Sequence, residues 1–356
     1  MSNKSEDPNK CHGSWGKMKV LANKTKKLRF IKSTTSTIFG TVLLITGASV
    51  YAAEMEISGV VEVEMGLVST DDNTSSDISL ATVEIGLDGT ITEGVDVHIL
   101  MLHEEDDTPL EIDEGTITLS NIADTSLSLT VGQMYLPFGK FESNMVSDPL
   151  TLEIGETRES TLALGYELDG IYGSFYVFNG NSENSTDDNA SDFGLNISYT
   201  TNTLDIGVSY LSSLAETDTM QESVDSAGDN VPGAIGMHAI VSMGKVKIIA
   251  EYVTAIEEFD AADFSFEGEA STPSAYSAEI AYTLSLMGKE TTMAASVQGT
   301  KEAANAGLAE SRIMFGLSSA LKDNTSLSLE FMNESDVEGG EGDGTNIVTA
   351  QIAVAF

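Results

Sequence analysis

Strict alternation of apolar and polar residues constrains the fold of this chain most, and residues 346–356 (NIVTAQIAVAF) show it clearly. One parity carries Val348, Ala350, Ile352, Val354 and Phe356, and the other carries Thr349, Gln351, Ala353 and Ala355. Successive side chains of a strand point to opposite faces. An apolar row that closes on a C-terminal aromatic residue is typical of the last strand of a transmembrane β-barrel. A soluble edge strand can alternate in the same way, so this segment alone leaves both alternatives open.

Comparable segments recur along the rest of the chain, and none after residue 54 has the pattern of a long amphipathic helix. Each is about 9–13 residues long, which is the length that crosses a bilayer at the tilt of a barrel strand. The segments are 55–68, 78–90, 94–104, 113–122, 126–135, 160–168, 171–179, 191–200, 203–213, 233–243, 246–255, 274–285, 290–300, 311–321, 324–333 and 346–356. This succession predicts an all-β fold, a transmembrane antiparallel β-barrel of about 16 strands.

The connections between these segments alternate in length and provide an independent test. Outer-membrane barrels have short periplasmic turns and long outer loops. The short connections are 169–170, 201–202, 243–245 and 322–324, and the long acidic ones are 69–77, 179–190, 214–232 and 334–344. A soluble β-protein has no reason to alternate its loop lengths in this way, so the membrane barrel is the better interpretation.

The longest connection, Leu136 to Glu159, differs from the other outer loops because it is rich in apolar residues. Long loops without structure of their own are usually functional or disordered. This one is too apolar to be disordered, so we expect it to pack in a sheltered place. A barrel of sixteen strands encloses a wide lumen. The sequence therefore predicts an inward-folded third extracellular loop that narrows the channel.

The first 53 residues have the composition of a secretory signal peptide. Nine of the seventeen Lys and Arg residues precede residue 34, an apolar run covers 38–50, and Ala52 and Ala53 follow it. An apolar run of this length is too short to span a bilayer comfortably. We therefore expect 1–53 to be a cleaved leader with Met18 as an alternative start, and 54–356 to form the outer-membrane barrel domain.

Charge and cysteine content exclude several classes of partner. Removal of 1–53 leaves 8 basic and 54 acidic residues, a formal charge of 8 − 54 = −46. Such a surface excludes nucleic acid as a partner and disfavours a phosphate channel lined by Lys and Arg. The only cysteine, Cys11, lies in the leader, so the exported chain has no disulfide.

Two adjacent stretches resemble a known family. The residues VGQMYLPFGKFESNMVSDPLTLEIGETRES (131–160) and LALGYELDGIYGSFYVFNG (162–180) resemble the LbtU-type siderophore porins of Gram-negative bacteria. The GQ-x-x-x-PFG element is similar, more distantly, to phosphate-selective porins. The resemblance implies an outer-membrane channel with uptake of an iron-siderophore. It transfers no ligand residues, and the acidity of this chain departs from the phosphate-selective group.

Strand parity predicts which charged side chains face the lumen. The predicted wall residues are Glu62, Glu64, Glu84, Asp88, Asp96, His98, Glu167, Asp205, Lys247, Glu251, Glu279, Arg312 and Glu330. The predicted constriction residues of the third loop are Lys140, Glu142, Asp148, Glu153, Glu156 and Arg158. The simpler interpretation is that these side chains form a solvated channel wall. The more specific interpretation is an electric field across the lumen, between the charges of the loop and the wall residues Lys247 and Arg312. Because carboxylates dominate, we expect a weakly selective, cation-preferring pore without a tight binding site.

No metal or cofactor site is expected from the sequence. The acidic runs 71–72, 104–107 and 187–188 lack the spacing of an EF-hand and fit solvated surfaces, although outer loops can share divalent cations with lipopolysaccharide. His98 and His103 are five residues apart, which places them on opposite faces of a regular strand. A shared ligand pair is therefore not expected.

The sequence also argues against catalysis. G-x-S-x-G, a Walker loop and H-E-x-x-H are absent, and strand one begins too early for the plug of a TonB-dependent receptor. We expect a porin for passive uptake of small polar solutes, with lipid, lipopolysaccharide and the barrel-assembly machinery as partners, Phe356 as insertion signal, and a homotrimeric state. The alternative is a surface-interaction barrel with a closed lumen.

Overall fold

A computed structural model describes residues 54–70, 73–104, 108–180, 190–224, 231–340, 342 and 344–356. The predicted signal peptide, 1–53, lies outside the described residues, as do the acidic positions 71–72, 105–107 and 187–188.

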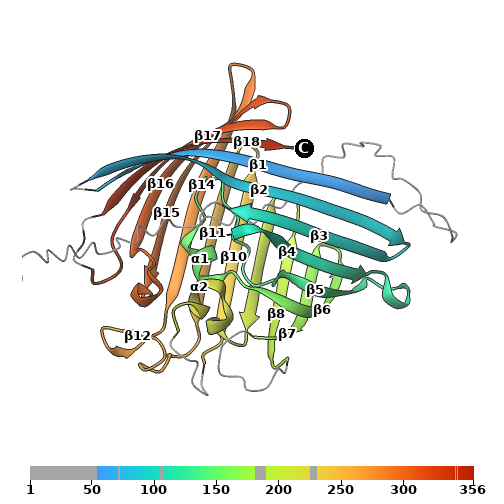
Figure 1. The fold of residues 1–356 in the computed structure, drawn as a ribbon. Helices are drawn as coiled ribbons and strands as arrows, with labels where there is room; N and C mark the ends of the chain where they lie inside the picture. The colour runs from blue at the N-terminus through green and yellow to red at the C-terminus, as the bar shows by residue number, and fades with distance from the viewer. Residues whose placement is uncertain are drawn as a thin grey trace, which may run out of the picture.

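Strands make up most of the described chain (Figure 1). They are β1 Glu54–Ser69, β2 Thr74–Thr92, β3 Val95–Glu104, β4 Thr108–Leu119, β5 Leu127–Tyr135, β6 Arg158–Leu168, β7 Ile171–Phe178, β8 Asp192–Thr200, β9 Leu204–Leu211, β10 Ala234–Met243, β11 Val246–Ala255, β12 Ser265–Phe266, β13 Glu269–Ala270, β14 Ser274–Leu286, β15 Lys289–Lys301, β16 Ser311–Lys322, β17 Thr325–Glu334 and β18 Thr345–Ala355.

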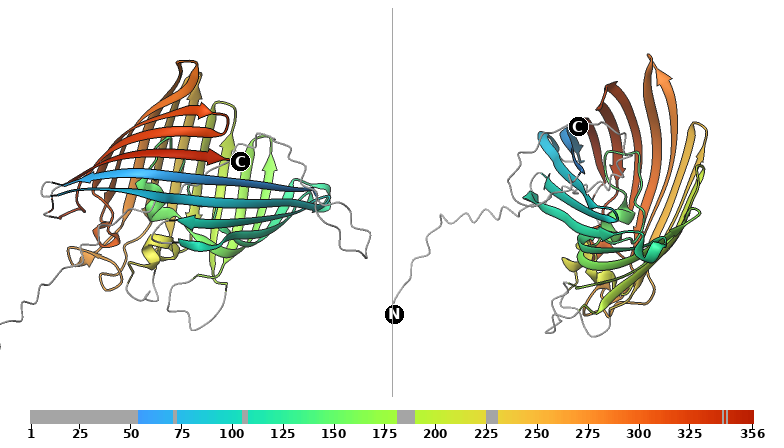
Figure 2. Two further views of the ribbon diagram at one scale, coloured as in Figure 1. Left: turned by 45° about the horizontal axis from the view of Figure 1, so that its top comes forward. Right: turned by 90° about the vertical axis from the view of Figure 1, so that its right-hand side faces the viewer.

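All of these strands except the short β12–β13 hairpin belong to one closed antiparallel barrel, which has sixteen strands within the described residues. Neighbours in sequence are neighbours in the sheet, and β1 pairs with both β2 and β18. The closing register places Glu62 opposite Ala353. Figures 1 and 2 show the strands as a strongly tilted wall. The predicted fold class is confirmed. Closure leaves no exposed sheet edge, which is a requirement for a sheet in lipid.

The outer surface of the barrel carries the apolar parity of each strand. On β18, Val348, Ile352 and Phe356 are 43%, 49% and 58% exposed, whereas Thr349 and Gln351 between them are 7% and 2% exposed. The same contrast holds on β16, where Ile313 and Phe315 face outwards. The parity predicted from the sequence is thus the parity observed.

The first two outer connections are shorter than predicted. The expected loop 69–77 is mostly strand, because β1 ends at Ser69, β2 begins at Thr74, and Leu67 pairs with Ser76. β4 likewise begins at Thr108 rather than at 113. Serine and threonine keep the ladder of backbone hydrogen bonds while their hydroxyls remain solvated, so the strands extend beyond their apolar rows.

The inner turns are short, as predicted, with one exception. Asp169 and Gly170 have φ values of 54° and 81°, the left-handed pair that a two-residue hairpin requires. The exception joins β4 to β5 over 120–126 and contains the 3-10 turn η1 Ile122–Asp124. Strand β4 ends at Leu119 because the apolar alternation stops there.

Two connections contain the α-helices of the described chain and contact each other and the wall. Loop 3, defined as 136–157, includes α1 Leu150–Gly155, and loop 5, defined by its described residues 212–224 and 231–233, includes η2 Leu214–Glu216 and α2 Asp218–Gln221. The two loops are joined by a hydrogen bond of 2.9 Å from the Asp218 amide to the Glu156 carbonyl. The sequence predicted loop 5 only as a long acidic outer connection, whereas its apolar residues Leu214 and Met220 are fully buried.

An apolar core forms between these loops and the inner faces of β6, β7, β9–β11 and β14. It also includes Phe259 and Phe264 from the β11–β14 connection, and Ala303 and Leu308 from the β15–β16 connection, which contains η3 Ala304–Ala306. Its members from loop 3 are Leu136, Phe138, Phe141, Leu150, Leu152 and Ile154. The apolar composition of loop 3 thus has a packing partner. No helix in the described part of the chain has the length and hydrophobicity needed to cross a membrane.

Candidate functional site

The candidate site is the barrel interior, and the backbone of loop 3 crosses it along the wall formed by β9 to β17. The loop begins beside β9, where the Gly139 amide donates to Ser209 Oγ at 2.9 Å. Two residues later Phe141 adopts a φ of 56°, which turns the chain along the wall. The next three wall residues to accept hydrogen bonds from loop amides are glutamates.

Glu251 of β11 makes the first carboxylate contact. Its Oε1 accepts from the Lys140 amide at 2.6 Å, and its Oε2 accepts from the Phe141 amide at 2.9 Å. The Thr151 hydroxyl adds a third bond at 3.1 Å as the loop returns. This glutamate therefore fixes both the outgoing and the returning branch of loop 3.

Glu279 of β14 makes the second contact, at the middle of the loop. Its oxygens accept from the Ser143 hydroxyl at 2.8 Å and from the amide and side chain of Asn144 at 3.0 and 2.6 Å. Met145 then packs into a small apolar cluster of wall residues that includes Met314 and Met332. The tip is thus held by a charged and an apolar contact side by side.

Glu330 of β17 makes the third contact, at the far end of the tip. It accepts from the Val146 amide at 2.5 Å and from the amide and hydroxyl of Ser147 at 3.1 and 2.5 Å. On the return, the Leu150 amide donates to Gln298 of β15 at 3.0 Å. Hydrogen bonds to an ionised acceptor are stronger than neutral ones, so three buried glutamates anchor the loop.

Every basic side chain that enters the interior of the described barrel has an acidic partner. Lys140 Nζ lies 3.3 Å from Asp205, Arg158 Nη1 lies 3.2 Å from Glu111, and Arg312 Nη1 lies 2.9 Å from Glu153. Arg312 also contacts Glu334 at 2.5 Å. The remaining pairs are Lys247 with Glu142 and Arg158 with Asp113. The interior therefore contains no cation free of a carboxylate in its described part.

Ion pairs cross between the loop and the wall in three places, and the first joins Lys140 of loop 3 to Asp205 of β9. Glu142 and Glu153 of loop 3 meet Lys247 and Arg312 of β11 and β16. Burial raises the pKa of Glu153, and the Arg312 guanidinium opposes that shift. The guanidinium is itself almost fully buried, and it also donates to the Asp148 carbonyl at 3.1 Å. This part of the loop is therefore fixed as well as charged.

The other predicted site residues have separate positions. Asp148 and Glu156 are buried within loop 3, Arg158 opens β6, and Glu84 lies on the inner face of β2. His98 and His103 lie on opposite faces of β3, and His98 contacts Asp88 at 2.7 Å. Within the described ranges, no group of three or more acidic, histidine or cysteine residues is arranged to hold a metal ion.

Several contributing residues were not predicted from the sequence. They are Ser209, Gln298, Glu334, Glu111 and Asp113. Parity places Ser209, Gln298 and Glu334 on the inner face, which was a usable signal. Nothing in the alternation indicates Asp113, because a β-bulge in the β3–β4 pairing brings it to Arg158.

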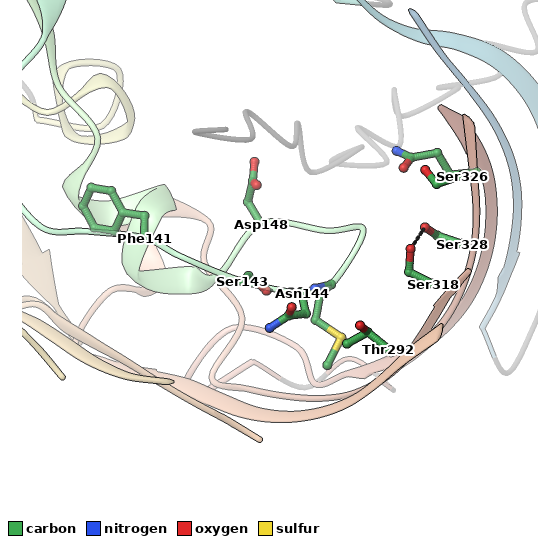
Figure 3. Close-up of a pocket in the computed structure, with 10 residues that line it drawn as sticks. Phe141, Ser143, Asn144, Asp148, Thr292, Ser318, Ser326 and Ser328 are labelled. Atoms are coloured by element: carbon green, nitrogen blue, oxygen red, sulfur yellow. Dashed lines mark hydrogen bonds between the residues drawn. The ribbon is translucent and has the colours of Figure 1, made fainter. Parts of the chain in front are cut away.

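A cavity of ≈ 250 Å³ lies between the tip of loop 3 and the wall of β15 to β18 (Figure 3). Its lining is dominated by hydroxyl and amide groups. The lining residues are Phe141, Ser143, Asn144, Met145, Asp148, Thr292, Ser318, Ser326, Ser328 and Gln351.

Phe356 closes the barrel at the end of β18. Its amide donates to the Gly59 carbonyl at 3.0 Å, and the Gly59 amide donates back to the Phe356 carbonyl at 2.9 Å. A Cβ on Gly59 would lie 2.4 Å from the Phe356 ring, so the ring lies directly over this glycine. The aromatic residue is thus part of the outer surface and of the closing seam.

Comparison with known proteins places this barrel in a family. The model of the family described as Gram-negative porin matches residues 40–354. A UPF0422 protein of Legionella pneumophila (strain Lens) is 25% identical over 331 residues, covering 80% of this chain and 62% of that protein. A UPF0422 protein of Coxiella burnetii is 26% identical over 268 residues, covering 67% of this chain and 58% of that protein. The chain thus spans less than two thirds of the length of these curated relatives.

Solved structures show the same fold at low sequence identity. The outer membrane channel DcaP of Acinetobacter baumannii has a TM-score of 0.62 at 15% identity, covering 88% of this chain and 100% of its own. Salmonella typhi OmpF in complex with daunomycin has a TM-score of 0.58 at 12% identity, covering 85% and 97%. Because the family model matches most of its length, the chain belongs to the Gram-negative porin family.

Proposed function

We propose that the protein is an outer-membrane porin that admits small polar solutes by passive diffusion. The observation that carries this proposal is the contrast between the two faces of the closed barrel. Its outer face is a continuous apolar surface suited to lipid, and its inner face is lined by carboxylates, hydroxyls and ion pairs. A barrel with this polarity encloses water when it is inserted in a bilayer.

The ion pairs support a preference for cations. Lys140, Arg158, Lys247 and Arg312 all lie beside carboxylates, and Arg158 and Arg312 have two acidic partners each. Neutralised basic groups attract anions weakly, whereas the remaining acidic groups of the wall attract cations. The selectivity is expected to be weak, because the charges are distributed around the wall.

Planar-bilayer recordings test the proposal. Purified protein should produce discrete conductance steps, and the reversal potential in a KCl gradient should report preference for K⁺ over Cl⁻. A reversal potential that favours Cl⁻ would refute the cation preference and leave the channel intact. A protein that inserts and remains silent would refute the channel itself.

The proposed solute is an iron-siderophore, by the resemblance of residues 131–160 and 162–180 to LbtU-type porins. The test is growth of a strain that lacks this protein under iron limitation, with purified siderophore supplied. A siderophore-dependent growth defect that the intact chain restores supports this substrate. Equal growth of both strains would refute it without affecting the channel proposal.

Assembly and export are further parts of the proposal. We expect cleavage of 1–53, recognition of the last strand and Phe356 by the barrel-assembly machinery, and a homotrimer in contact with lipid and lipopolysaccharide. Mass spectrometry of the purified protein should give an N-terminus at Ala53 or Glu54 and a trimer in native spectra. Replacing Phe356 with alanine should reduce the amount of folded protein in the outer membrane.

One observation favours the rival function of a surface-interaction barrel with a closed lumen. The apolar core of loops 3 and 5 fills the interior beside β6 to β14 and reduces the space available for water. The cavity beside β15 to β18 lies away from that core and favours an open passage. Conductance separates the two functions, because only an open lumen carries current.

A further inference from the structure

We propose that the cavity beside β15 to β18 is a weak binding subsite for uncharged, hydroxyl-rich small molecules. This inference rests on the proposed channel function, because a solute reaches the cavity only through an open lumen. It goes beyond general diffusion by assigning one place in the channel and one chemical class of solute.

A row of aligned hydroxyl groups on successive strands runs along the barrel wall, and three of its members, Thr292, Ser318 and Ser328, line the cavity. Thr283 pairs with Thr292, Thr292 with Ser318, and Ser318 with Ser328, so the four residues lie at one level across β14 to β17. We call these four residues the hydroxyl row. Gln351 of β18 continues the same level opposite Ser328. Figure 3 shows Thr292, Ser318 and Ser328 facing the tip of loop 3.

The hydroxyl row is held in place by its own hydrogen bonds. Ser328 Oγ donates to Ser318 Oγ at 3.0 Å, and the hydroxyls of Thr283 and Thr292 are 3.0 Å apart. A hydroxyl has one donor and two acceptor positions, so one such bond leaves capacity for a ligand. Thr292 and Ser318 are half-buried and therefore accessible from the lumen. The row thus offers fixed groups that both donate and accept.

The opposite side of the cavity is fixed as well. Ser143 and Asn144 line it, and both are hydrogen-bonded to Glu279. Met145 is 3% exposed and packs on the wall beneath the tip. Both sides of the cavity are therefore formed before a solute arrives, which lowers the entropic cost of binding.

Charge and size define the class of solute. Asp148 is the charged residue that lines the cavity, and none of the four interior basic residues contributes to the lining. The lining therefore offers no basic group to an anionic ligand, which disfavours anions. The volume of ≈ 250 Å³ lies below the range of about 300–1,000 Å³ typical of drug-sized ligands. A neutral polyol or single sugar ring, with hydroxyls along its length, matches these constraints.

Sorbitol and gluconate form a matched pair of probes, because both are six-carbon open chains and only gluconate is charged. The experiment measures uptake of labelled sorbitol into proteoliposomes containing the full chain, together with KCl conductance of the same preparation. We expect sorbitol flux to saturate, with half-saturation on the order of millimolar, as suits a few neutral hydrogen bonds. Gluconate should need a concentration at least about tenfold higher.

Two variants and one control test the location. Ser318→Ala with Ser328→Ala should raise the half-saturating sorbitol concentration about tenfold, and Thr292→Val about threefold. The control is Thr118→Val with Thr130→Val, which removes a hydroxyl pair 3.0 Å apart on β4 and β5. This control should leave half-saturation unchanged, because neither residue lines the cavity.

The possible failures are distinguishable. The subsite is overturned if sorbitol flux rises linearly with concentration, if gluconate is taken up equally well, or if half-saturation is unchanged in both variants. Normal KCl conductance in the same preparation would still uphold the channel. Absence of both sorbitol flux and KCl conductance would overturn the subsite and the proposed function together.

Discussion

Three wall glutamates determine the course of loop 3, and each does so by accepting hydrogen bonds from backbone amides. Glu251, Glu279 and Glu330 lie on β11, β14 and β17, and each receives at least one loop amide. Parity predicted that these residues face inwards but suggested a solvated wall or a transverse field. The contacts give them an anchoring role instead, since their oxygens are occupied by the loop.

The first prediction concerns Glu279. Glu279→Gln replaces one acceptor oxygen with an amide that meets the donor groups of Ser143 and Asn144. Hydrogen bonds to a charged group contribute about 1.5–3 kcal/mol. We therefore expect the free energy that holds loop 3 against the wall to fall by that amount. Open-channel current noise and protease cleavage within loop 3 should both increase. The control Asp88→Asn removes a wall carboxylate that contacts His98, and it should change neither.

The second prediction concerns the contact between Gly194 and Tyr176. A Cβ on Gly194 would lie 2.1 Å from Tyr176 Cζ, and the Tyr176 side chain is fully buried. Gly194→Ala should therefore lower the free energy of unfolding by about 1–3 kcal/mol, as overpacking does. Urea-induced unfolding in detergent measures the change. Gly66→Ala is the matched control, because no atom lies within 4 Å of that Cβ position; an equal loss there would contradict the steric explanation.

Loop 3 and loop 5 are the elements that differentiate this barrel from an open cylinder. Loop 3 follows the wall from Ser209 on β9 to Glu330 on β17. Loop 5 contacts loop 3 through the hydrogen bond from the Asp218 amide to the Glu156 carbonyl. Together they occupy one side of the interior.

The third prediction tests loop 3 as a whole. Replacing residues 140–156 with a short Gly/Ser linker should increase unit conductance, because the loop occupies part of the lumen. Single-channel recordings in KCl measure the change. As a control, the β17–β18 connection, 335–344, is replaced by a short linker in the same way. The conductance of this control variant should resemble that of the intact protein. Unchanged conductance after loss of loop 3 would mean that the loop does not limit the passage.

The fourth prediction tests the packing of loop 5. Met220 is fully buried in the apolar core, so Met220→Asp places a carboxylate there without a partner. Such a change is expected to cost several kcal/mol unless the loop leaves the core. Limited proteolysis should then cleave within 212–224. Thr219→Asp adds the same charge at a half-exposed neighbour and should leave the loop protected.

The whole molecule is an apolar cylinder with an acidic interior, and its long-range field depends on salt. The formal charge of the chain is −39, and the interior basic groups are paired. Fields from distributed charges are screened over the Debye length. The size of any selectivity is therefore a property of the whole wall rather than of one residue.

The fifth prediction follows from this screening. Preference for K⁺ over Cl⁻, measured from reversal potentials at a fixed KCl ratio, should decrease as mean KCl rises from 0.1 M to 1 M. The Debye length falls from about 10 Å to about 3 Å over that range. A preference that is independent of salt would instead indicate a local filter. Substituting tetramethylammonium for K⁺ would then show whether size contributes to it.

The sequence predicted the fold well because alternation is a local property. The row from Val348 to Phe356 and the turn at Asp169–Gly170 are visible in a window of a few residues, and both appear in the structure. The burial of loop 5 was not predicted because its apolar residues, such as Leu214 and Met220, are scattered among acidic ones. Their burial depends on the core that the other loops provide.

By itself, the sequence determined the all-β class, the number of barrel strands and the face that the apolar rows occupy, since a period of two needs no information from distant residues. Only the tertiary structure decided which inward-facing groups meet. Glu330 receives the Val146 amide from 184 residues away, and Asp113 reaches Arg158 through a bulge. Such pairings depend on barrel closure and on the register between strands, and a local pattern carries no record of either.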